Sequence, residues 1–394
     1  MLHAHRADHH HCLAADSRLP HRAGGCDPGV FQAAAAGAPA LRLVTDPAVF
    51  RAVLASAYDS KDATLNLAVR RSLSWFEAPS AQTHFPIEGV TFDRAKASVT
   101  RFADILTEAT WKDQFIADTM SSFSLYESVG WDGSGTVLFT GYYAPEFRAS
   151  ATRSGSFQYP LYKLPPDLVK DPATGLPLGR RVNGTLQPWP ARREIDQSGM
   201  LAGTELVWLS SPLDAYIIHV NGSAKLLMPD GSTLYVGYAG KTDRPYTGLG
   251  STMVKRGLIS PDRLSLPSLR AYFKQHPEQA EPLIYENENY VFFQEYAPGT
   301  WPAGSLGVTV TEKRSLATDK AIFPRGGIVI ADTHIPTYSG GRRPFVQFMV
   351  DQDTGGAIKA PGRADIFMGV GAVAELVAGR QYTEGRLYYL FLNQ

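Results

Sequence analysis

Residues 352–367, QDTGGAIKAPGRADIF, place Asp353 and Asp365 twelve positions apart around a Gly-Gly turn. The strand-like run FVQFMVDQD ends at Asp353, and a second strand is expected to start near Asp365. The glycines at 355–356 can adopt positive φ, and the Pro-Gly pair at 361–362 can form a second turn. These turns would let the two strands lie side by side and return both acids to one cleft.

The composition is that of a globular chain with sizeable cores. The chain has 394 residues, 44% of them hydrophobic, which suffices for two compact domains or for one domain with a large insertion. Its 38 basic and 38 acidic residues balance, so no strong field argues for nucleic acid or an anionic membrane as a partner. No apolar run approaches the roughly 20 residues of a membrane-spanning helix.

The N-terminal segment has an unusual composition. Six of the ten histidines and both cysteines, Cys12 and Cys26, lie in the first 26 residues, so the body of the protein has neither a disulfide nor a cysteine nucleophile. The segment lacks the apolar stretch of about 7–15 residues found in a secretory signal. We interpret residues 1–42 as a disordered leader or the product of a misplaced start codon, with order expected from near Leu41.

The body of the chain changes from helical to β-rich patterns. From Asp46 to about Ser128 apolar residues recur at helical spacing, and Asp46 precedes a proline as a cap would. After Gly130, short apolar runs alternate with turn residues and predict strands. The expected strands include TVLFTGYYAPEF, ELVWLSS, NYVFFQEY, SLGVTVTEK, GGIVIAD, FVQFMVDQD and RLYYLFL.

Two hairpins and two short helices complete the expected organisation. The run AYIIHVNGSAKLLMPDGSTLYVGYAGK predicts hairpins with turns at Asn221-Gly222 and Asp230-Gly231. Helices are expected around SLPSLRAYFKQHPEQ and over GAVAELVAGR, the latter ending at Gly379. Many short strands with few helices suggest a barrel or a sandwich, with an all-β block in the middle of the chain.

Carboxylates are the remaining candidates for catalysis. The sequence contains no G-x-S-x-G, no H-E-x-x-H, no Walker loop and no spaced Cys/His set. A buried acid suits protonation of a glycosidic oxygen, and glycosidases commonly use two carboxyls. Asp353 and Asp365 could form such a pair, with Lys359 and Arg363 holding at least one acid ionised. The alternative is that Asp353 only forms a turn and that Asp365 lies on a surface loop.

Tyrosine-rich runs give a second indication. TGYYAPEF and YPLYKLPPDL place tyrosines at expected strand ends, where aromatic faces could stack on sugars. A tyrosine-rich core would have the same composition, so sugar binding and core packing stay open on this observation.

Six blocks of the sequence follow one another in a recognisable order. They are FTGYYAPEF (139–147), YPLYKLPPDLV (159–169), DAYIIHVNGSAKLLMPDGSTLYVGYAGKTDRPYTGLG (214–250), NENYVFFQEY (287–296), GSLGVTVTEKRSLATDKAIFPRG (304–326) and QDTGGAIKAPGRADIFMGVG (352–371). In this order the chain resembles the membrane-bound lytic murein transglycosylase A family over about residues 100–394.

The resemblance implies a mainly β fold with an α-helical N-terminal part. A double-psi β-barrel domain is expected from residues 43–145 and 288–394, and a second β-domain from the inserted residues 146–287, with a groove between the two domains for a glycan strand. The C-terminal part resembles the segment that the family calls 3D, after its aspartates.

The resemblance also implies an activity. The family is a carbon–oxygen lyase that cleaves the β-1,4 bond between N-acetylmuramic acid and N-acetylglucosamine in peptidoglycan and leaves a 1,6-anhydromuramoyl end. No cofactor and no metal are implied. A monomer acting on glycan strands in the periplasm is expected, with association with the outer membrane or cell wall, although the leader has no convincing lipobox.

Site residues carry over by motif. Asp365 matches the family acid that first donates and then accepts a proton, and Asp353 matches a second aspartate, interpreted as its support. Asp319 is expected to be structural, and Ala360 departs from the commoner glycine, which matters only if this position needs positive φ. The expected substrate-binding residues are Thr140, Gly141, Tyr142, Tyr143, Tyr162, Asn221, Gly222 and Lys359.

Two other functions remain open from the sequence. Asp353 and Asp365 could act as an inverting pair of a β-glycan hydrolase, as in endoglucanases with a similar barrel. The tyrosine-rich motifs would equally suit a non-catalytic glycan-binding protein like the expansins.

Overall fold

The computed structural model describes residues 39–172, 175–355 and 358–394. Within them the chain divides into two compact units. The barrel unit holds residues 39–143, 303–369 and 376–394, and the insert unit holds residues 144–302 and 370–375, apart from the gaps. The leader's histidines and both cysteines lie outside the described residues.

The barrel unit begins with helices whose starts agree with the capping signals in the sequence. Asp46 accepts a hydrogen bond from the amide of Ala48 with Pro47 in the first turn, and Asp62 and Thr91 cap the next long helices in the same way. The helices are α1 (Pro47–Tyr58), α2 (Ala63–Phe76), the 3₁₀ turn η1 (Pro79–His84), α3 (Phe92–Glu108) and α4 (Lys112–Ser122).

Strands that are distant in sequence close the barrel. Among the described residues, six strands form a ring in the order β17-β14-β15-β13-β16-β3, and β3 returns to pair with β17. The strands β1 and β2 extend this sheet beside β17. Their bounds are β1 (Leu41–Leu43), β2 (Phe123–Ser128), β3 (Val137–Ala144), β13 (Ser315–Ala317), β14 (Ile328–Pro336), β15 (Arg342–Asp353), β16 (Arg363–Val370) and β17 (Tyr382–Leu392).

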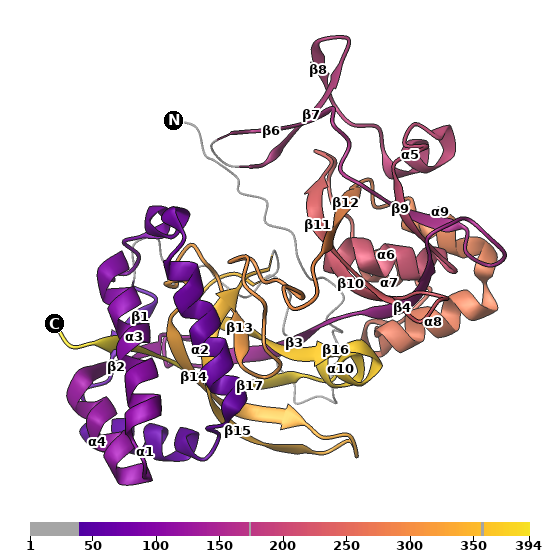
Figure 1. The fold of residues 1–394 in the computed structure, drawn as a ribbon. Helices are drawn as coiled ribbons and strands as arrows, with labels where there is room; N and C mark the ends of the chain where they lie inside the picture. The colour runs from indigo at the N-terminus through magenta and orange to yellow at the C-terminus, as the bar shows by residue number, and fades with distance from the viewer. Residues whose placement is uncertain (1–38, 173–174, 356–357) are drawn as a thin grey trace. The chain divides into compact units, whose positions relative to one another are not determined.

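The helices cover one part of the barrel. α1 and α2 pack on β15, and α3 packs on β17; Figure 1 draws these helices in indigo and purple beside the barrel strands. The rings of Phe102 and Phe115 lie 5.2 and 5.6 Å from that of Phe348 in β15, so the helical aromatic residues are core, as expected. This cover fixes β15, the strand that ends at Asp353.

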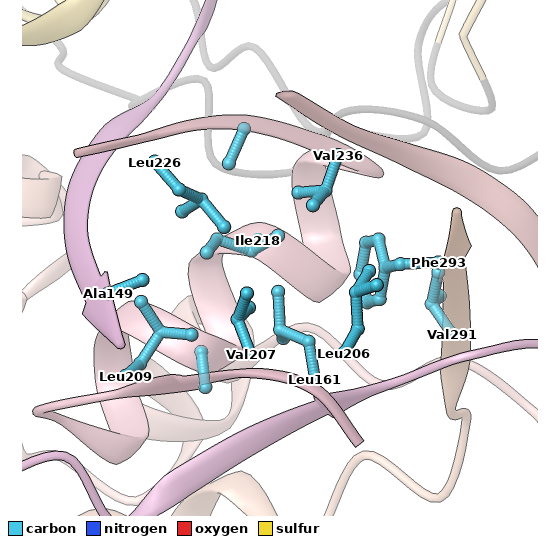
Figure 2. Packing of buried hydrophobic residues seen from close by; sticks show 12 residues of the cluster. Ala149, Leu161, Leu206, Val207, Leu209, Ile218, Leu226, Val236, Val291 and Phe293 are labelled. Carbon is cyan, nitrogen blue, oxygen red and sulfur yellow. The ribbon is translucent and has the colours of Figure 1, made fainter. Parts of the chain in front are cut away.

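The insert unit has its own sheet and core. Its described strands form a six-stranded sheet in the order β12-β11-β10-β4-β9-β5 and a small β6-β7-β8 sheet. Figure 2 shows the core, in which Ile218 packs against Leu226, Val236 and Phe293. The strands are β4 (Glu146–Ser150), β5 (Tyr159–Tyr162), β6 (Leu168–Lys170), β7 (Pro177–Val182), β8 (Thr185–Gln187), β9 (Glu205–Leu209), β10 (Ser223–Leu227), β11 (Thr233–Lys241) and β12 (Val291–Tyr296).

Helices also contribute to the insert unit, so the middle block is not all-β. The helix expected around SLPSLRAYFKQHPEQ is α8, and GAVAELVAGR forms α10, which ends just before Gly379. The helices are α5 (Arg192–Ser198), α6 (Pro212–Asn221), α7 (Leu249–Lys255), η2 (Pro261–Arg263), α8 (Leu266–Gln275), η3 (Pro277–Gln279) and α9 (Ala280–Ile284). Of α10 (Gly371–Ala378), residues 371–375 belong to the insert unit and the rest to the barrel unit.

One predicted hairpin is wrong and the other is confirmed. Residues 212–221 form α6 because Ser211 caps the helix and Pro212 occupies its first turn. Gly222 ends α6 with φ +70°, so it is a helix cap and not a hairpin turn. The Asp230-Gly231 turn does join β10 to β11 as an antiparallel hairpin.

Two further segments differ from the sequence expectation. The run SLGVTVTEK (305–313) contains no strand, and the chain is instead held by turns up to β13. The chain also returns to the barrel unit later than residue 288, since β12 pairs antiparallel with β11 in the insert sheet. The rest of the fold agrees with the expected mainly β architecture, with a helical N-terminal part, a closed barrel and an inserted second domain.

Candidate functional site

Asp353 and Asp365 lie on either side of the short strand β13. Ala317 is the register partner of Asp353 in the parallel pair with β15 and of Asp365 in the antiparallel pair with β16. The sequence suggested that the strands carrying these two acids would be neighbours, but in the structure they are not adjacent. Two interstrand spacings, about 10 Å between the backbones, separate them, and β13 fills the space between.

A β-bulge precedes Asp353. β15 advances from Asp351 to Asp353 while β13 advances only from Leu316 to Ala317, so Gln352 is the extra residue. The Gln352 amide nitrogen donates to the carbonyl of Ala68 at 3.0 Å and so points to α2. Bulges bend a strand and re-aim its side chains. At this bulge the side chains around Asp353 depart from the regular alternation of β15.

Asp365 is buried and held by two neighbours. The residue is only 1% exposed, and its Oδ1 accepts a hydrogen bond from Thr140 Oγ1 of β3. Arg363 Nε lies 3.6 Å from the same oxygen, and Arg363 Nη2 donates to Thr140 Oγ1 at 3.5 Å. These contacts fix the orientation of the carboxyl group.

The environment of Asp365 favours its protonated form. Burial raises the pKa of Asp365, the Arg363 guanidinium opposes this shift, and the negative charge of Asp353 adds to it. A carboxyl with a raised pKa retains its proton at higher pH and can donate it to a leaving group. Asp365 therefore has the properties of a general acid.

Asp353 has a different environment. Its Oδ1 accepts hydrogen bonds from the backbone amides of Ser305 and Thr354, each at 2.8 Å. A Cβ added to Gly304 would lie 2.8 Å from the Gln352 carbonyl and 3.3 Å from the Asp353 carboxyl carbon, so the loop approaches closely. Asp353 thus anchors the loop at 304–305 to the end of β15.

Tyr142 connects the acids. It is 6% exposed, and its ring packs 5.1 Å from that of Phe367. Burial raises the pKa of Tyr142 well above its ordinary value. Asp353 adds to this shift through its charge and a hydrogen bond, and the charges of Asp365 and Asp351 add to it further. The hydroxyl therefore stays protonated beside Asp353.

The neighbours of Tyr142 in β3 are buried as well. Tyr143 is 8% exposed, and a Cβ on Gly141 would lie 3.0 Å from both Ala378 Cα and Gln381 Cβ. Glycine at 141 thus permits close packing against the turn after α10. Of the four expected residues of β3, Thr140 and Tyr142 lie with Asp353, Arg363 and Asp365, and these five residues are called the acid site. Gly141 and Tyr143 alternate with them along the strand and belong to its other face.

The loop between the two acids is tied to Asp319. Asp319 Oδ2 accepts from the amide of Ala360 at 3.0 Å, and Oδ1 accepts from the amide of Ala321 at 3.1 Å, which suits the structural role expected for it. Ala360 has φ +68°, a left-handed conformation that favours glycine. Lys359 is exposed on this loop, and residues 356–357 lie outside the described part.

Three expected substrate-binding residues belong to the insert unit and have structural surroundings there. Tyr162 is 7% exposed and packs in a cluster with Trp189 and Tyr290. The Asn221 amide nitrogen donates to the carbonyl of Ile217 at 2.9 Å within α6, and Gly222 caps that helix. These contacts explain the residues as parts of the core and of a helix end.

The comparison with known proteins agrees with this fold. The MltA specific insert domain family matches residues 138–294, and the 3D domain family matches residues 314–391. Membrane-bound lytic murein transglycosylase A of Escherichia coli K12 is 32% identical over 271 residues, which are 67% of this chain and 68% of that protein. The chain belongs to the membrane-bound lytic murein transglycosylase A family.

Solved structures of the family have the same fold. A membrane-bound lytic murein transglycosylase from Agrobacterium tumefaciens superposes with a TM-score of 0.69 at 27% identity, covering 83% of this chain and 92% of that one. The E. coli structure with bound chitohexaose has a TM-score of 0.67 at 23% identity and covers 84% and 89%. The second likeness bears on the fold alone.

The structure adds residues that the sequence did not assign. The amide of Ser305 bonds to Asp353, although its segment was expected to be a strand. Asp351 is buried and lies two positions before Asp353 in the same strand. This spacing was the only feature of the sequence that pointed to Asp351. In the described residues no group of three or more His, Cys, Asp or Glu could hold a metal ion, and no helix there is long and apolar enough to cross a membrane.

Proposed function

We propose that this chain cleaves the β-1,4 bond between N-acetylmuramic acid and N-acetylglucosamine in peptidoglycan without consuming water. Asp365 donates its proton to the glycosidic oxygen, and the bond from that oxygen to C1 of the muramoyl residue breaks. The C6 hydroxyl of the same residue then forms the new bond to C1 and returns its proton to Asp365. The products are a free 4-hydroxyl and a 1,6-anhydromuramoyl end.

The observation that carries this proposal is the burial of Asp365 together with its raised pKa in a chain of this family. One group that begins protonated and ends protonated can serve both halves of the reaction. Thr140 and Arg363 support the second half, because both can stabilise the carboxylate after the proton has left.

The surroundings of Asp353 favour a supporting role over that of a second catalyst. Two backbone amides bond to its Oδ1, as expected for a loop anchor. A hydrolase pair would need this carboxylate to activate a water molecule. The non-catalytic alternative has less support, since burying an ionisable carboxyl group costs free energy and has no evident use in binding alone.

Glycan strands of the cell wall are the proposed partner. Thr140 and Tyr142 are proposed to contact the sugar at the acid site, with Gly141, Tyr143, Tyr162, Asn221, Gly222 and Lys359 as further binding residues. No cofactor or metal takes part in the proposed reaction. The proposed site of action is the periplasm, with the protein a monomer associated with the outer membrane or the cell wall.

The experiment that tests the proposal is the Asp365→Asn variant on purified murein sacculi. We expect turnover to fall at least about 10³-fold, because positioned acid–base catalysis contributes about 10²- to 10⁴-fold and the same group acts twice. Binding of chitohexaose, measured by calorimetry, should stay close to that of the wild type. Turnover retained by Asp365→Asn would contradict the assignment of the acid.

Thermal unfolding gives the folding control for this variant. Because the pKa of Asp365 is raised in the folded state, the wild type loses stability as the pH rises above the ordinary aspartate value of about 3.9. Asparagine removes that cost. Asp365→Asn should therefore unfold at a higher temperature than the wild type at pH 7, and the difference should shrink as the pH falls toward 3.9.

A further inference from the structure

A second buried ionic group lies next to the acid site. Lys320 is 5% exposed and Asp351 is 0% exposed, and the Lys320 ammonium forms an ion pair with Asp351 Oδ1. Asp351 Oδ2 accepts from Thr318 Oγ1 at 2.7 Å and from the Tyr389 hydroxyl at 2.8 Å. The Lys320 ammonium also donates to Thr318 Oγ1 at 2.9 Å. The proposed reaction uses none of these groups.

Such a pair is not explained by stability alone. Removing two charges from water costs free energy that their attraction offsets only partly, and apolar replacements of buried ion pairs are often neutral or stabilising. Burial raises the pKa of Asp351 and lowers that of Lys320, with each partner opposing the shift of the other. One role known for buried ionic groups is to fix a single arrangement of the chain.

The arrangement that it fixes is segment 318–320, which meets both ends of the loop between the two acids. At one end, the amide of Thr318 donates to the Asp353 carbonyl at 3.1 Å, and Thr354 Oγ1 donates to the Thr318 carbonyl at 2.8 Å. At the other end, Asp319 accepts from the amide of Ala360. Lys320 and its neighbours thus clamp the residues that follow Asp353 and those that precede Arg363.

We propose that Lys320 and Asp351 are positioning residues for the acid site, and that segment 318–320, held by this pair, sets the place of Asp353 relative to Asp365. This inference rests on the proposed function. The charge of Asp353 reaches both Lys320 and Asp365, so a displacement of Asp353 changes the electrostatics of the acid. In the proposed role Lys320 and Asp351 act through Asp353 and do not touch the substrate.

The first test replaces the pair by the uncharged combination Lys320→Met with Asp351→Leu. We expect the melting temperature to stay within a few degrees of the wild type, KM for sacculi to stay within about twofold, and kcat to fall by about tenfold or more. The basic limb of the kcat–pH profile should move to lower pH, because a displaced Asp353 no longer favours the protonated form of Asp365. Arg363, Thr140 and Tyr142, which also face Asp365, are unchanged in this variant.

A second variant tests the inference if the double variant does not fold. Thr354→Val leaves the ion pair intact and removes only the hydrogen bond to the Thr318 carbonyl, so kcat and the basic limb should change in the same direction by a smaller amount. Thr354→Ser keeps the hydroxyl and should restore both. As a matched control, Arg101→Met with Glu108→Gln neutralises an exposed ion pair on α3 and should change neither quantity.

Hydrogen exchange supplies a readout that does not depend on activity. Peptides containing Thr354 and Ala360 should exchange faster in both test variants than in the wild type and in the control. Wild-type kcat, pH profile and exchange in the folded double variant, or in Thr354→Val, would overturn the inference. An inactive wild type would instead contradict the proposed function, and the exchange rates would still decide whether the clamp exists.

Discussion

Thr140 and Arg363 both contact Oδ1 of Asp365 and fix the orientation of this fully buried acid. The hydroxyl comes from β3 and the guanidinium from β16, two positions before the acid. Burial raises the pKa of Asp365, and Arg363 is the largest opposing influence. The balance between these two effects sets the pH range over which the acid keeps its proton.

Arg363→Gln tests this balance. Without the guanidinium the pKa of Asp365 should rise further, so the protonated acid persists to higher pH. The basic limb of the kcat/KM–pH profile for sacculi should therefore move to higher pH. Arg363→Lys keeps a positive charge and should shift the limb less. A basic limb that stays in place or moves to lower pH in Arg363→Gln would show that Arg363 does not control the acid.

The sequence alone predicted only part of this residue-scale picture. Asp353, Asp365 and Arg363 share one short stretch, so their proximity could be foreseen. The contact of Thr140 with Asp365 joins residues 225 positions apart and requires closure of the barrel. Lys320 and Asp351 were missed because a charged residue inside an apolar strand does not reveal which partner compensates it.

At the scale of elements, the turn before β16 carries strain that the sequence could not establish. Ala360 departs from the commoner glycine of the family, and the departure matters because its φ is +68°. A left-handed conformation costs an L-residue roughly 1–2 kcal/mol. The amide bond to Asp319 holds Ala360 in this conformation.

Ala360→Gly should relieve that strain. Glycine also gives the unfolded chain more conformational entropy, which offsets about 0.5–1 kcal/mol of this gain. We therefore expect the free energy of unfolding, measured by denaturant titration, to rise by about 0.5 kcal/mol. Gly307→Ala is the matched opposite: Gly307 has φ +76° and a Cβ there would meet nothing within 4 Å, so only backbone strain acts. Gly307→Ala should therefore be destabilised by a similar amount, about 0.5 kcal/mol. Destabilisation by Ala360→Gly would contradict this account of the turn.

Helix α6 shows why element predictions failed where they did. The β-branched residues Ile217, Ile218 and Val220 favour a strand, but the Ser211-Pro212 start and the Gly222 end are helix signals, and the core of the insert unit buries Ile218. In segment 305–313 the apolar alternation was present, yet the chain instead supplies the Ser305 amide to Asp353. In α6 the local end signals and the core outweigh the β-branched residues, whereas in segment 305–313 a tertiary contact overrides the local pattern.

At the scale of the whole molecule, the order of six sequence blocks predicted more than periodicity did. Periodicity suggested only a barrel or a sandwich, because pairing between distant strands leaves no local signal. The resemblance supplied the barrel, the insertion and Asp365, and the matched families and the identity to curated relatives confirm the family and the fold. The place of β13 between the two acids came from the structure alone.

In the proposed reaction one acid, Asp365, cleaves murein without water. Mass spectrometry of the muropeptides released by the wild type from purified sacculi tests it most directly, with Asp365→Asn as the blank. We predict products that are each one water lighter than those of hydrolysis, with a 1,6-anhydromuramoyl end that borohydride does not reduce, and none from the variant. Reducible ends carrying the mass of an added water would contradict the claim and favour a hydrolase that uses both aspartates.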